Sequence, residues 1–219
     1  MSVKLNPKIA SVLAPAYLPC AEFKGACSEM RWQPEAGHVP RGFLGATGSL
    51  EDVELVLVFA EPGDPQPGES HTGLESAYEY ATLGFGNGKD LFHRNVLRIL
   101  GMCWPELSFE QQLRKAWLTE SVLCSARTEG APVSVPASRA CGRRYLLAQL
   151  AMFPSALVVA LGKKAQSRLQ GLGVRSFLPV FAAAPPGCNR REALASWAQI
   201  PLELERRRQL RAPSSAFTD

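Results

Sequence analysis

The sequence predicts an α/β fold, a three-layer α/β/α architecture around a central four-stranded, mainly parallel sheet. Two observations lead to this prediction. Four short runs are almost continuously apolar, which is typical of strands buried on both faces of a parallel sheet. Segments with helical periodicity separate these runs, and this alternation favours helices layered on both faces of the sheet.

The N-terminal segment is expected to be an arm rich in loops. Its apolar stretch, Ile9–Leu18, is interrupted by Pro15, and no convincing small-residue cleavage site follows it. We therefore expect a structured arm of a cytoplasmic protein rather than a signal peptide. No run reaches the roughly 18 apolar residues that a membrane helix needs.

The first strand is expected at Val53–Ala60, a run with a high β-branched content. It stops at residues 61–65, where two prolines cannot donate to a sheet ladder and Gly63 permits a turn. Helical patterns follow at 74–83 and 90–100, and the second pattern places its apolar residues close to one face.

The second strand is expected at Trp117–Cys124, and a loop follows over 130–136. Ser138 is positioned to cap a helix that reaches Phe153. The third strand, Ala156–Leu161, has the clearest strand pattern in the chain.

The third strand runs directly into Gly162–Lys164, where a helix begins and exposes backbone N–H groups. A fourth strand at 177–182 ends at 185–187. A long helix then precedes a tail, 212–219, that is expected to be disordered. Without repeats or a linker, we expect a single domain over 1–211.

Ligands of parallel sheets bind beyond the carboxyl ends of the strands. This rule selects the loops 61–70, 124–136, 162–164 and 184–191. The formal net charge of +4 is compatible with a nucleic-acid partner but does not require one. The basic residues gather in short groups that are either solvated helix faces or parts of one binding surface.

The six cysteines are not expected to form disulfides, because no secretory signal is evident. They are therefore either buried thiols or ligands of a metal site. They occupy positions 20, 27, 103, 124, 141 and 188.

Four motifs lie at the selected loops in a definite order and spacing. The first strand leads into an acidic–Pro–Gly turn at Glu61-Pro62-Gly63, and the second carries Thr119-Glu120-Ser121-Val122-Leu123-Cys124 ahead of Cys141. The third ends in Ala160-Leu161-Gly162-Lys163-Lys164-Ala165, and the fourth ends at Ala184-Pro185-Pro186. With these motifs the chain resembles the uracil-DNA glycosylase superfamily, most closely its iron–sulfur-type bacterial branch.

The resemblance covers about residues 20–200 and implies a hydrolase of DNA base excision repair. Such an enzyme cleaves the N-glycosidic bond of uracil, or of a related deaminated base, and leaves an abasic site. A monofunctional glycosylase is expected, because no lysine belongs to a pocket motif. The implied partner is DNA containing uracil or another damaged base, and the implied state is a monomer.

Two alternatives remain open. The first is a protein of the same fold that is impaired in catalysis and binds damaged or abasic DNA. The second is an unrelated doubly wound enzyme that acts on a nucleotide, although no phosphate-cradling glycine motif supports it.

Glycosidic cleavage builds positive charge on the sugar and negative charge on the departing base. A carboxylate can stabilise the cation and orient a water, and fixed donors can hold the base. The resemblance implies that Glu61 is this carboxylate, with Asp64 as its competitor. Pro62 and Gly63 would bind the base, with backbone N–H groups near Gly63 facing a base carbonyl.

Two positions depart from the family pattern. Glu120 replaces the Asn that recognises the uracil edge, and Ala184 replaces the His of the final motif. An ionised Glu only accepts hydrogen bonds, whereas a Glu protonated through burial also donates. Three alternatives remain open for Glu120. The pocket prefers a base with more hydrogen-bond donors, Glu120 assists catalysis, or its side chain points to solvent.

Further contacts follow from the resemblance. Phe85, or alternatively Tyr80, is expected to stack on the flipped base. The loop after the fourth strand would wedge into the minor groove, and basic residues would meet phosphates. The implied DNA-binding residues are Gly162, Lys163, Lys164, Pro185, Pro186, Asn189, Arg190 and Arg191.

Four cysteines match the ligand set of the iron–sulfur branch, Cys20, Cys27, Cys124 and Cys141. Four thiolates satisfy a [4Fe–4S] cluster. The first two are separated by six residues, where the branch usually has two. The alternative is that these cysteines are small buried core residues.

Overall fold

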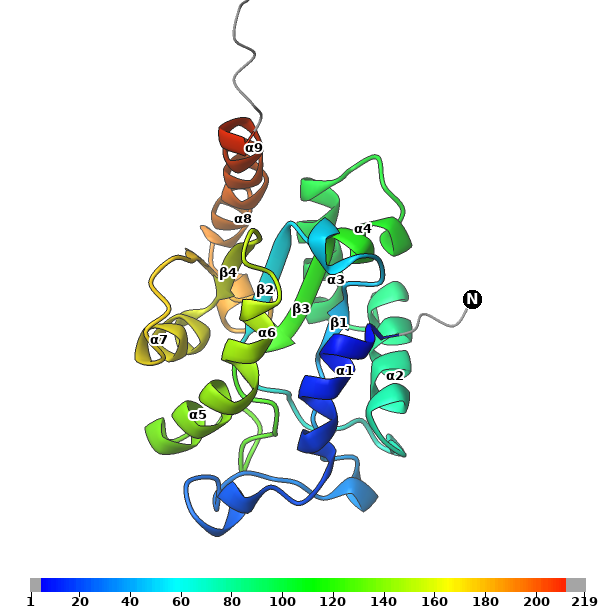
Figure 1. Cartoon of the computed structure of the whole chain (residues 1–219), viewed down its shortest axis with the longest axis vertical. Helices are drawn as coiled ribbons and strands as arrows, with labels where there is room; N and C mark the ends of the chain where they lie inside the picture. Colours follow the sequence, from blue (N-terminus) through cyan, green and yellow to red (C-terminus); the bar gives the residue numbers. More distant parts are fainter. Residues whose placement is uncertain (1–4, 212–219) are drawn as a thin grey trace, which may run out of the picture.

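The computed structural model describes residues 5–211 and shows an α/β fold on one mixed five-stranded sheet (Figure 1). The order across the sheet is β1-β3-β2-β4-β5. The strands are β1 (Leu44–Gly45), β2 (Leu55–Phe59), β3 (Ala116–Glu120), β4 (Leu157–Leu161) and β5 (Leu178–Val180).

Four of the strands run parallel to one another. β2 pairs in parallel with β3 and β4, β4 pairs in parallel with β5, and β1 is antiparallel to β3. The α/β class is therefore confirmed, and each expected strand overlaps one of the parallel strands. The expected number of four strands is wrong, because β1 adds a fifth. Two residues ending in a glycine carry no hydrophobic pattern that predicts a strand.

The carboxyl ends of β2, β3, β4 and β5 lie at the same edge of the sheet, which we call the carboxyl edge. The expected second strand is too long, since β3 ends at Glu120 and residues 121–124 continue beyond the sheet. Glu61 follows the end of β2, and Glu120 is the last residue of the neighbouring strand β3.

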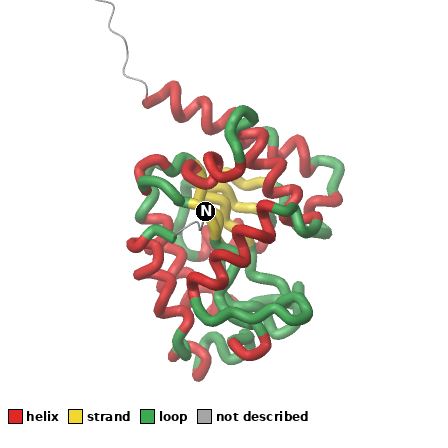
Figure 2. The backbone as a smooth tube through the Cα atoms, turned by 90° about the vertical axis from the view of Figure 1, so that its right-hand side faces the viewer, coloured by secondary structure: helices red, strands yellow, loops and turns green. Residues whose placement is uncertain are grey.

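Helices cover both faces of the sheet, with α6 on one face and α3 on the other (Figures 1 and 2). On the α6 face, Trp117 Nε1 donates to Gln149 Oε1 at 3.1 Å. On the α3 face, the rings of Phe59 and Phe92 meet edge to face, with centroids 5.0 Å apart. The helices are α1 (Pro7–Leu13), α2 (Leu74–Gly86), α3 (Leu91–Cys103), α4 (Phe109–Lys115), α5 (Val135–Cys141), α6 (Leu147–Ala151), α7 (Lys163–Gly171), α8 (Ala193–Trp197) and α9 (Gln199–Arg211).

The helix expected to start at Ser138 begins earlier. Ser134 is the N-cap of α5, and its Oγ accepts a hydrogen bond from the Ala137 N–H at 3.2 Å. Pro136 lies in the first turn, where its missing N–H costs nothing. The proline therefore belongs to the helix rather than to the expected loop. A π-helical segment, Gly142–Leu146, links α5 to α6.

Helices α1 and α4 are additions to the expected elements. In α4, Ser108 and Gln111 form a reciprocal capping box, which stabilises a helix of only seven residues. The expected long terminal helix is divided into α8 and α9. The tail expected to be disordered, 212–219, lies outside the described residues.

One hydrophobic core joins the N-terminal arm to the sheet and the last helix. All five residues of β2 are buried, as a strand covered on both faces requires. Ile9 and Leu13 of α1 are 0% exposed, and Leu204 of α9 belongs to the same core. Among the described residues, no helix has the length and apolarity needed to cross a membrane.

Candidate active site

Glu61 lies just beyond the carboxyl end of β2, and its side chain is only 7% exposed. Its Oε1 is 2.5 Å from Lys164 Nζ, and its Oε2 is 2.5 Å from Arg168 Nη2. Arg168 Nη1 donates to Ala60 O and to Ser121 Oγ, so the guanidinium also holds the ends of β2 and β3. Glu61 is thus a buried carboxylate whose charge is offset by two cations of α7.

Lys164 is one of the two cations that contact the Glu61 carboxylate. Its Nζ donates to Glu61 and also to Gly130 O at 3.1 Å and Ala131 O at 3.2 Å. These carbonyls belong to the loop after β3, and Glu61 follows β2. One ammonium group of α7 therefore joins the segments that follow β2 and β3. The resemblance implied a phosphate contact for Lys164, but all three of its donors are used within the protein.

Glu120 ends β3 and pairs in register with Phe59 of β2. Its side chain does not point to solvent, since the residue is 4% exposed. Burial holds the pKa of Glu120 well above its usual range, and Glu61 raises it further, while Arg168 and Arg41 lower it. A neutral carboxyl, which donates as well as accepts, is therefore the favoured form.

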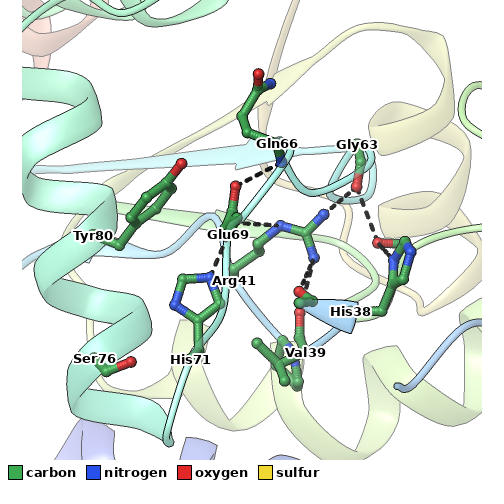
Figure 3. A network of polar contacts seen from close by, with 12 residues as sticks. His38, Val39, Arg41, Gly63, Gln66, Glu69, His71, Ser76 and Tyr80 are labelled. Carbon is green, nitrogen blue, oxygen red and sulfur yellow. Dashed lines mark hydrogen bonds and ion pairs between the residues drawn. The ribbon is translucent and has the colours of Figure 1, made fainter. Parts of the chain in front are cut away.

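Arg41, whose charge lowers the pKa of Glu120, belongs to a second polar network (Figure 3). Its guanidinium donates to Gly63 O, and its Nε lies 3.6 Å from Glu69 Oε1. Gly42 has a φ of +85° and packs against Glu120, because a Cβ there would lie 2.7 Å from Oε1. The left-handed backbone at this glycine lets the segment before β1 close over the buried acid.

Glu69 is the centre of this second network (Figure 3). It accepts hydrogen bonds from Gln66 N–H and from His71 Nε2, each at 2.9 Å. Burial alone raises the pKa of Glu69, but these bonds, one from Tyr80 and the charge of Arg41 lower it overall. The side chain of His71 is 1% exposed, and its Nδ1 has no partner within the described part of the chain.

The acidic–Pro–Gly turn is held through its backbone. Pro62 is buried and Gly63 is exposed, and Gly63 O accepts a hydrogen bond from Ser125 Oγ at 3.0 Å. Asp64 is exposed and forms an ion pair with Arg31. The competing catalytic acid therefore lies outside the buried cluster around Glu61.

The two aromatic candidates occupy different environments. Phe85 is 1% exposed, and its ring packs edge-on against Phe92 and His93, with centroids 5.7 Å and 4.5 Å away. It is a core residue without a free face, so the stacking role expected for it is not supported. Tyr80 is partly buried and lies beside His71, with ring centroids 5.2 Å apart.

The expected DNA-binding residues lie on the loops that follow β4 and β5. Gly162 precedes α7 with a φ of +88°, and a Cβ there would lie 2.8 Å from the Ala182 Cβ. Asn95 of α3 donates to Ala183 O at 2.8 Å and so fixes the start of the loop that follows β5. The exposed members of the expected set are Lys163, Lys164, Pro185, Pro186, Asn189, Arg190 and Arg191.

A cavity of about 410 Å³ lies next to the Glu69 network. It is lined by Glu35, Ala36, His38 and residues 64–70, so Glu69 belongs to both features. His38 Nδ1 is 3.4 Å from Ser125 Oγ, and burial followed by the charges of nearby arginines lowers the pKa of His38. Glu61 and Glu120 do not line this cavity and are covered by the surrounding loops.

The four cysteines expected to bind a cluster line one common cavity. Cys20 and Cys27 come from the N-terminal arm, Cys124 from the loop after β3, and Cys141 from the end of α5. Burial raises the pKa of the Cys124 thiol, and the other three cysteines raise it further, which places all four close together. Cys103 and Cys188 do not line this cavity.

The four thiols line one cavity without forming a compact metal site in residues 5–211. No group of three or more His, Cys, Asp or Glu among residues 5–211 converges closely enough to hold one metal ion. A [4Fe–4S] cluster takes one thiolate on each iron, so its ligands surround a larger object. The free volume between the side chains is only about 20 Å³, and the four thiols would have to turn outward around a cluster.

Two donors already point at sulfur in this cavity. The Leu123 N–H donates to Cys141 Sγ at 3.4 Å, and Arg144 Nη1 lies 3.8 Å from Cys20 Sγ. Hydrogen bonds of this kind favour thiolates and tune cluster potentials. The donor set therefore fits the cofactor that the resemblance implies.

Four residues of the site were missed by the sequence analysis: Arg41, Glu69, His71 and Arg168. Arg168 lies four residues after Lys164, and this helical spacing places both cations on one face. The sequence could therefore have predicted that Arg168 lies beside Lys164. The other three lie in loops, where no periodicity indicates which side chains meet.

No model of a known protein family matches the chain, and no curated protein sequence matches it either. The function is therefore inferred from the chemistry of the carboxyl edge.

Proposed function

We propose that the chain is a DNA glycosylase that hydrolyses the N-glycosidic bond of uracil or a related deaminated base. One observation carries the proposal. Two carboxyl groups, Glu61 and Glu120, meet at the ends of adjacent parallel strands in environments that differ in charge. Enzymes that hydrolyse the glycosidic bonds of sugars use two carboxyl groups with separate roles, and we extend this division of roles to an N-glycosidic bond.

Glu61 is suited to stabilise positive charge on the sugar. Its side chain is held in place by Lys164 and Arg168, each 2.5 Å away. An ionised carboxylate beneath the sugar would stabilise the oxocarbenium-like transition state and orient a water molecule. The protonated Glu120, by contrast, would face the base.

The exposed basic residues support a DNA partner. Lys163 begins α7 next to the site, and Arg190 and Arg191 follow the loop after β5. Cations at these places would contact phosphates and hold a duplex at the carboxyl edge. The target nucleotide would have to be flipped out of the stack to reach the buried carboxyls.

The four cysteines of the common cavity would hold a [4Fe–4S] cluster. When bound, the cluster would supply covalent cross-links between the N-terminal arm and the segment after β3. The residues of the active site would perform the hydrolysis without it.

A second candidate function is damage binding without catalysis. Two observations favour it. Glu61 is fully engaged by cations of the protein itself, and Ala184 has no side chain that could donate to a departing base. A protein of this kind would bind uracil-containing or abasic DNA and release no base.

The deciding experiment is a single-turnover time course of base release from an oligonucleotide that contains one uracil. Wild-type protein should release uracil and leave an abasic site, and Glu61→Gln should slow the reaction by about 100-fold or more. Glu110→Gln, an exposed carboxylate on α4, is the matched control and should leave the rate unchanged. Preferential binding of uracil-containing DNA without base release would instead establish the second candidate.

A further inference from the structure

The cavity of about 410 Å³ beside the Glu69 network has the size of a small-molecule site. Three carboxylates line it, from Glu35, Asp64 and Glu69. No lysine or arginine belongs to its lining, which comes from residues 35, 36, 38 and 64–70. A ligand of this cavity is therefore expected to be cationic rather than anionic.

The backbone around the cavity offers few free hydrogen-bond donors. Pro65 and Pro67 have no N–H group. The Gln66 N–H donates to Glu69 Oε2, and the Glu69 N–H donates to Gln66 O, each at 2.9 Å. The His38 N–H is likewise used, since it donates to a backbone carbonyl at 3.0 Å. The cavity walls therefore present mainly acceptors, which suit a ligand that supplies N–H groups.

His38 adds a buried acceptor to this lining. Ser125 Oγ gives its only proton to Gly63 O at 3.0 Å, so it accepts from His38 Nδ1 at 3.4 Å. Burial and the charges of two nearby arginines lower the pKa of His38, which keeps the ring neutral and leaves a lone pair on Nε2. The residue is 7% exposed, and Nε2 has no hydrogen-bond partner in residues 5–211. Because buried polar groups are nearly always satisfied, we expect a ligand donor at this nitrogen.

The charges around the cavity are not balanced. Arg31 forms an ion pair with Asp64, and Arg41 Nε lies 3.6 Å from Glu69 Oε1 (Figure 3). Glu35 is exposed and forms no ion pair with any described residue. Three carboxylates thus face two guanidinium groups, and the negative charge of Glu35 is left without a counter-charge. One positive charge on a ligand would compensate it.

We infer that this cavity binds a small molecule through a primary ammonium group, which donates to His38 Nε2 and pairs with Glu35. Two other classes of cation fit less well. Quaternary ammonium groups have no N–H and are bound by aromatic rings, which the lining residues do not include. A metal ion needs several converging ligands, and no group of three or more His, Cys, Asp or Glu among residues 5–211 provides them. The site does not depend on the proposed function, because Glu61 and Glu120 do not line the cavity.

An NMR titration of the full chain tests this site with two probes of equal charge. The first is butylamine, which is protonated at neutral pH, and the second is butyltrimethylammonium, which carries methyl groups in place of the N–H protons. Butylamine should bind saturably, and the methylated probe should bind at least about tenfold more weakly, because it cannot donate to His38 Nε2. The net charge of +4 opposes nonspecific attraction of either probe.

Substitutions identify the residues that bind the amine. His38→Phe keeps an aromatic ring but has no acceptor, and it should weaken butylamine binding by about tenfold or more. Glu35→Gln removes an exposed charge that no described residue pairs with, and it should weaken binding by about fivefold. Glu110→Gln, on the exposed side of α4, is the matched control and should leave the affinity unchanged.

Four outcomes would overturn the inference. They are absence of saturable butylamine binding, equal affinity for the two probes, unchanged affinity in both the His38 and the Glu35 variants, and displacement of butylamine by an equal concentration of Mg²⁺. The last outcome would identify a metal site instead. If His38→Phe fails to fold, Glu35→Gln and the pair of probes still decide, because the exposed Glu35 has no structural partner in the described chain.

Discussion

The two acids of the carboxyl edge differ because different side chains surround them. Glu61 meets Lys164 and Arg168 at 2.5 Å, whereas the Oε2 of Glu120 meets no partner in the described residues. A buried carboxyl without a partner lowers its free energy by keeping its proton. Two residues of one type thereby have different surroundings within one site.

The raised pKa of Glu120 predicts a pH dependence of stability. The folded pKa lies above the unfolded value of about 4.3, so the folded state binds the proton more tightly. The stabilisation from the protonated side chain is complete below about pH 4.3 and decreases as the pH rises toward the folded pKa. Glu120→Gln cannot ionise, so its stability relative to wild type should increase with pH, by about 1.4 kcal/mol per pH unit between the two pKa values.

Chemical denaturation of both proteins at several pH values measures this difference. Glu110→Gln serves as the control, because the exposed Glu110 on α4 has ordinary solvation. A Glu120→Gln protein that becomes less stable than wild type as the pH rises would show that Glu120 is ionised in the folded state.

At the level of single residues, the sequence was informative where a motif ties a residue to a strand end. Glu61 follows a continuous apolar run, so its place at the carboxyl edge was predictable, whereas Glu120 was expected within the second strand and in fact ends β3. The partners of Glu61 were not predicted as its partners, because a pair 103 residues apart forms only through the order of the strands. Arg41 and Glu69 lie in loops whose paths follow from tertiary contacts alone.

At the scale of elements, the segment before β1 closes the site because of Gly42. Its φ of +85° and the 2.7 Å between a Cβ there and Glu120 Oε1 both disfavour any side chain. Gly42→Ala should therefore lower the free energy of unfolding by about 1–3 kcal/mol. Gly101→Ala is the matched control, since Gly101 lies within α3 with no atom near its Cβ position, and it should stabilise by up to about 1 kcal/mol.

Urea denaturation of these two variants tests the comparison. Loss of stability in Gly42→Ala together with a gain in Gly101→Ala is the expected result. If both variants change stability in the same direction and to the same extent, the packing of the segment against Glu120 is not what requires glycine.

The closed conformation of the loop that follows β3 should depend on the side chain of Lys164. Two of its carbonyls, Gly130 O and Ala131 O, accept hydrogen bonds from this side chain. Charge-assisted bonds of about 1.5 kcal/mol or more correspond to about a tenfold change in loop opening. Lys164→Met should therefore raise tryptic cleavage after the exposed Arg127 by about tenfold, and Lys163→Met should not.

Mass spectrometry of short digests locates and times this cleavage. Lys163 is the appropriate control because it adjoins Lys164 on α7 and is exposed. Equal cleavage in the two variants would show that other contacts hold the loop over Glu61.

Elements with a strong periodic pattern were predictable, and elements held by tertiary contacts were not. The four parallel strands follow from continuous apolar runs, which only a sheet covered on both faces needs. β1 has two residues and exists through its pairing with β3. The prediction that Ser138 caps the helix was wrong because Pro136, which was expected in the loop, fits the first turn of α5.

At the scale of the whole molecule, the cysteine cavity joins parts of the chain that are distant in sequence. Cys20 and Cys27 belong to the N-terminal arm, while Cys124 and Cys141 flank the loop that carries the Lys164 contacts. Sequence spacing alone left two readings open, a cluster and a set of buried thiols. The shared cavity is compatible with both, so an experiment has to decide between them.

A cluster in this cavity would make the stability of the arm depend on iron, because metal binding and folding are coupled. Anaerobic reconstitution with iron and sulfide should load about four iron atoms per wild-type chain. Cys141→Ser should lose most of this iron, and Cys188→Ser, whose thiol lies outside the cavity, should keep it. Removing iron from the wild type should speed proteolysis within residues 14–30, whereas the sheet should stay resistant. Equal iron content in the two variants, or an arm whose proteolysis does not respond to iron, would mean that the four thiols are core residues and that the arm is held by its buried side chains, Ile9 and Leu13 among them.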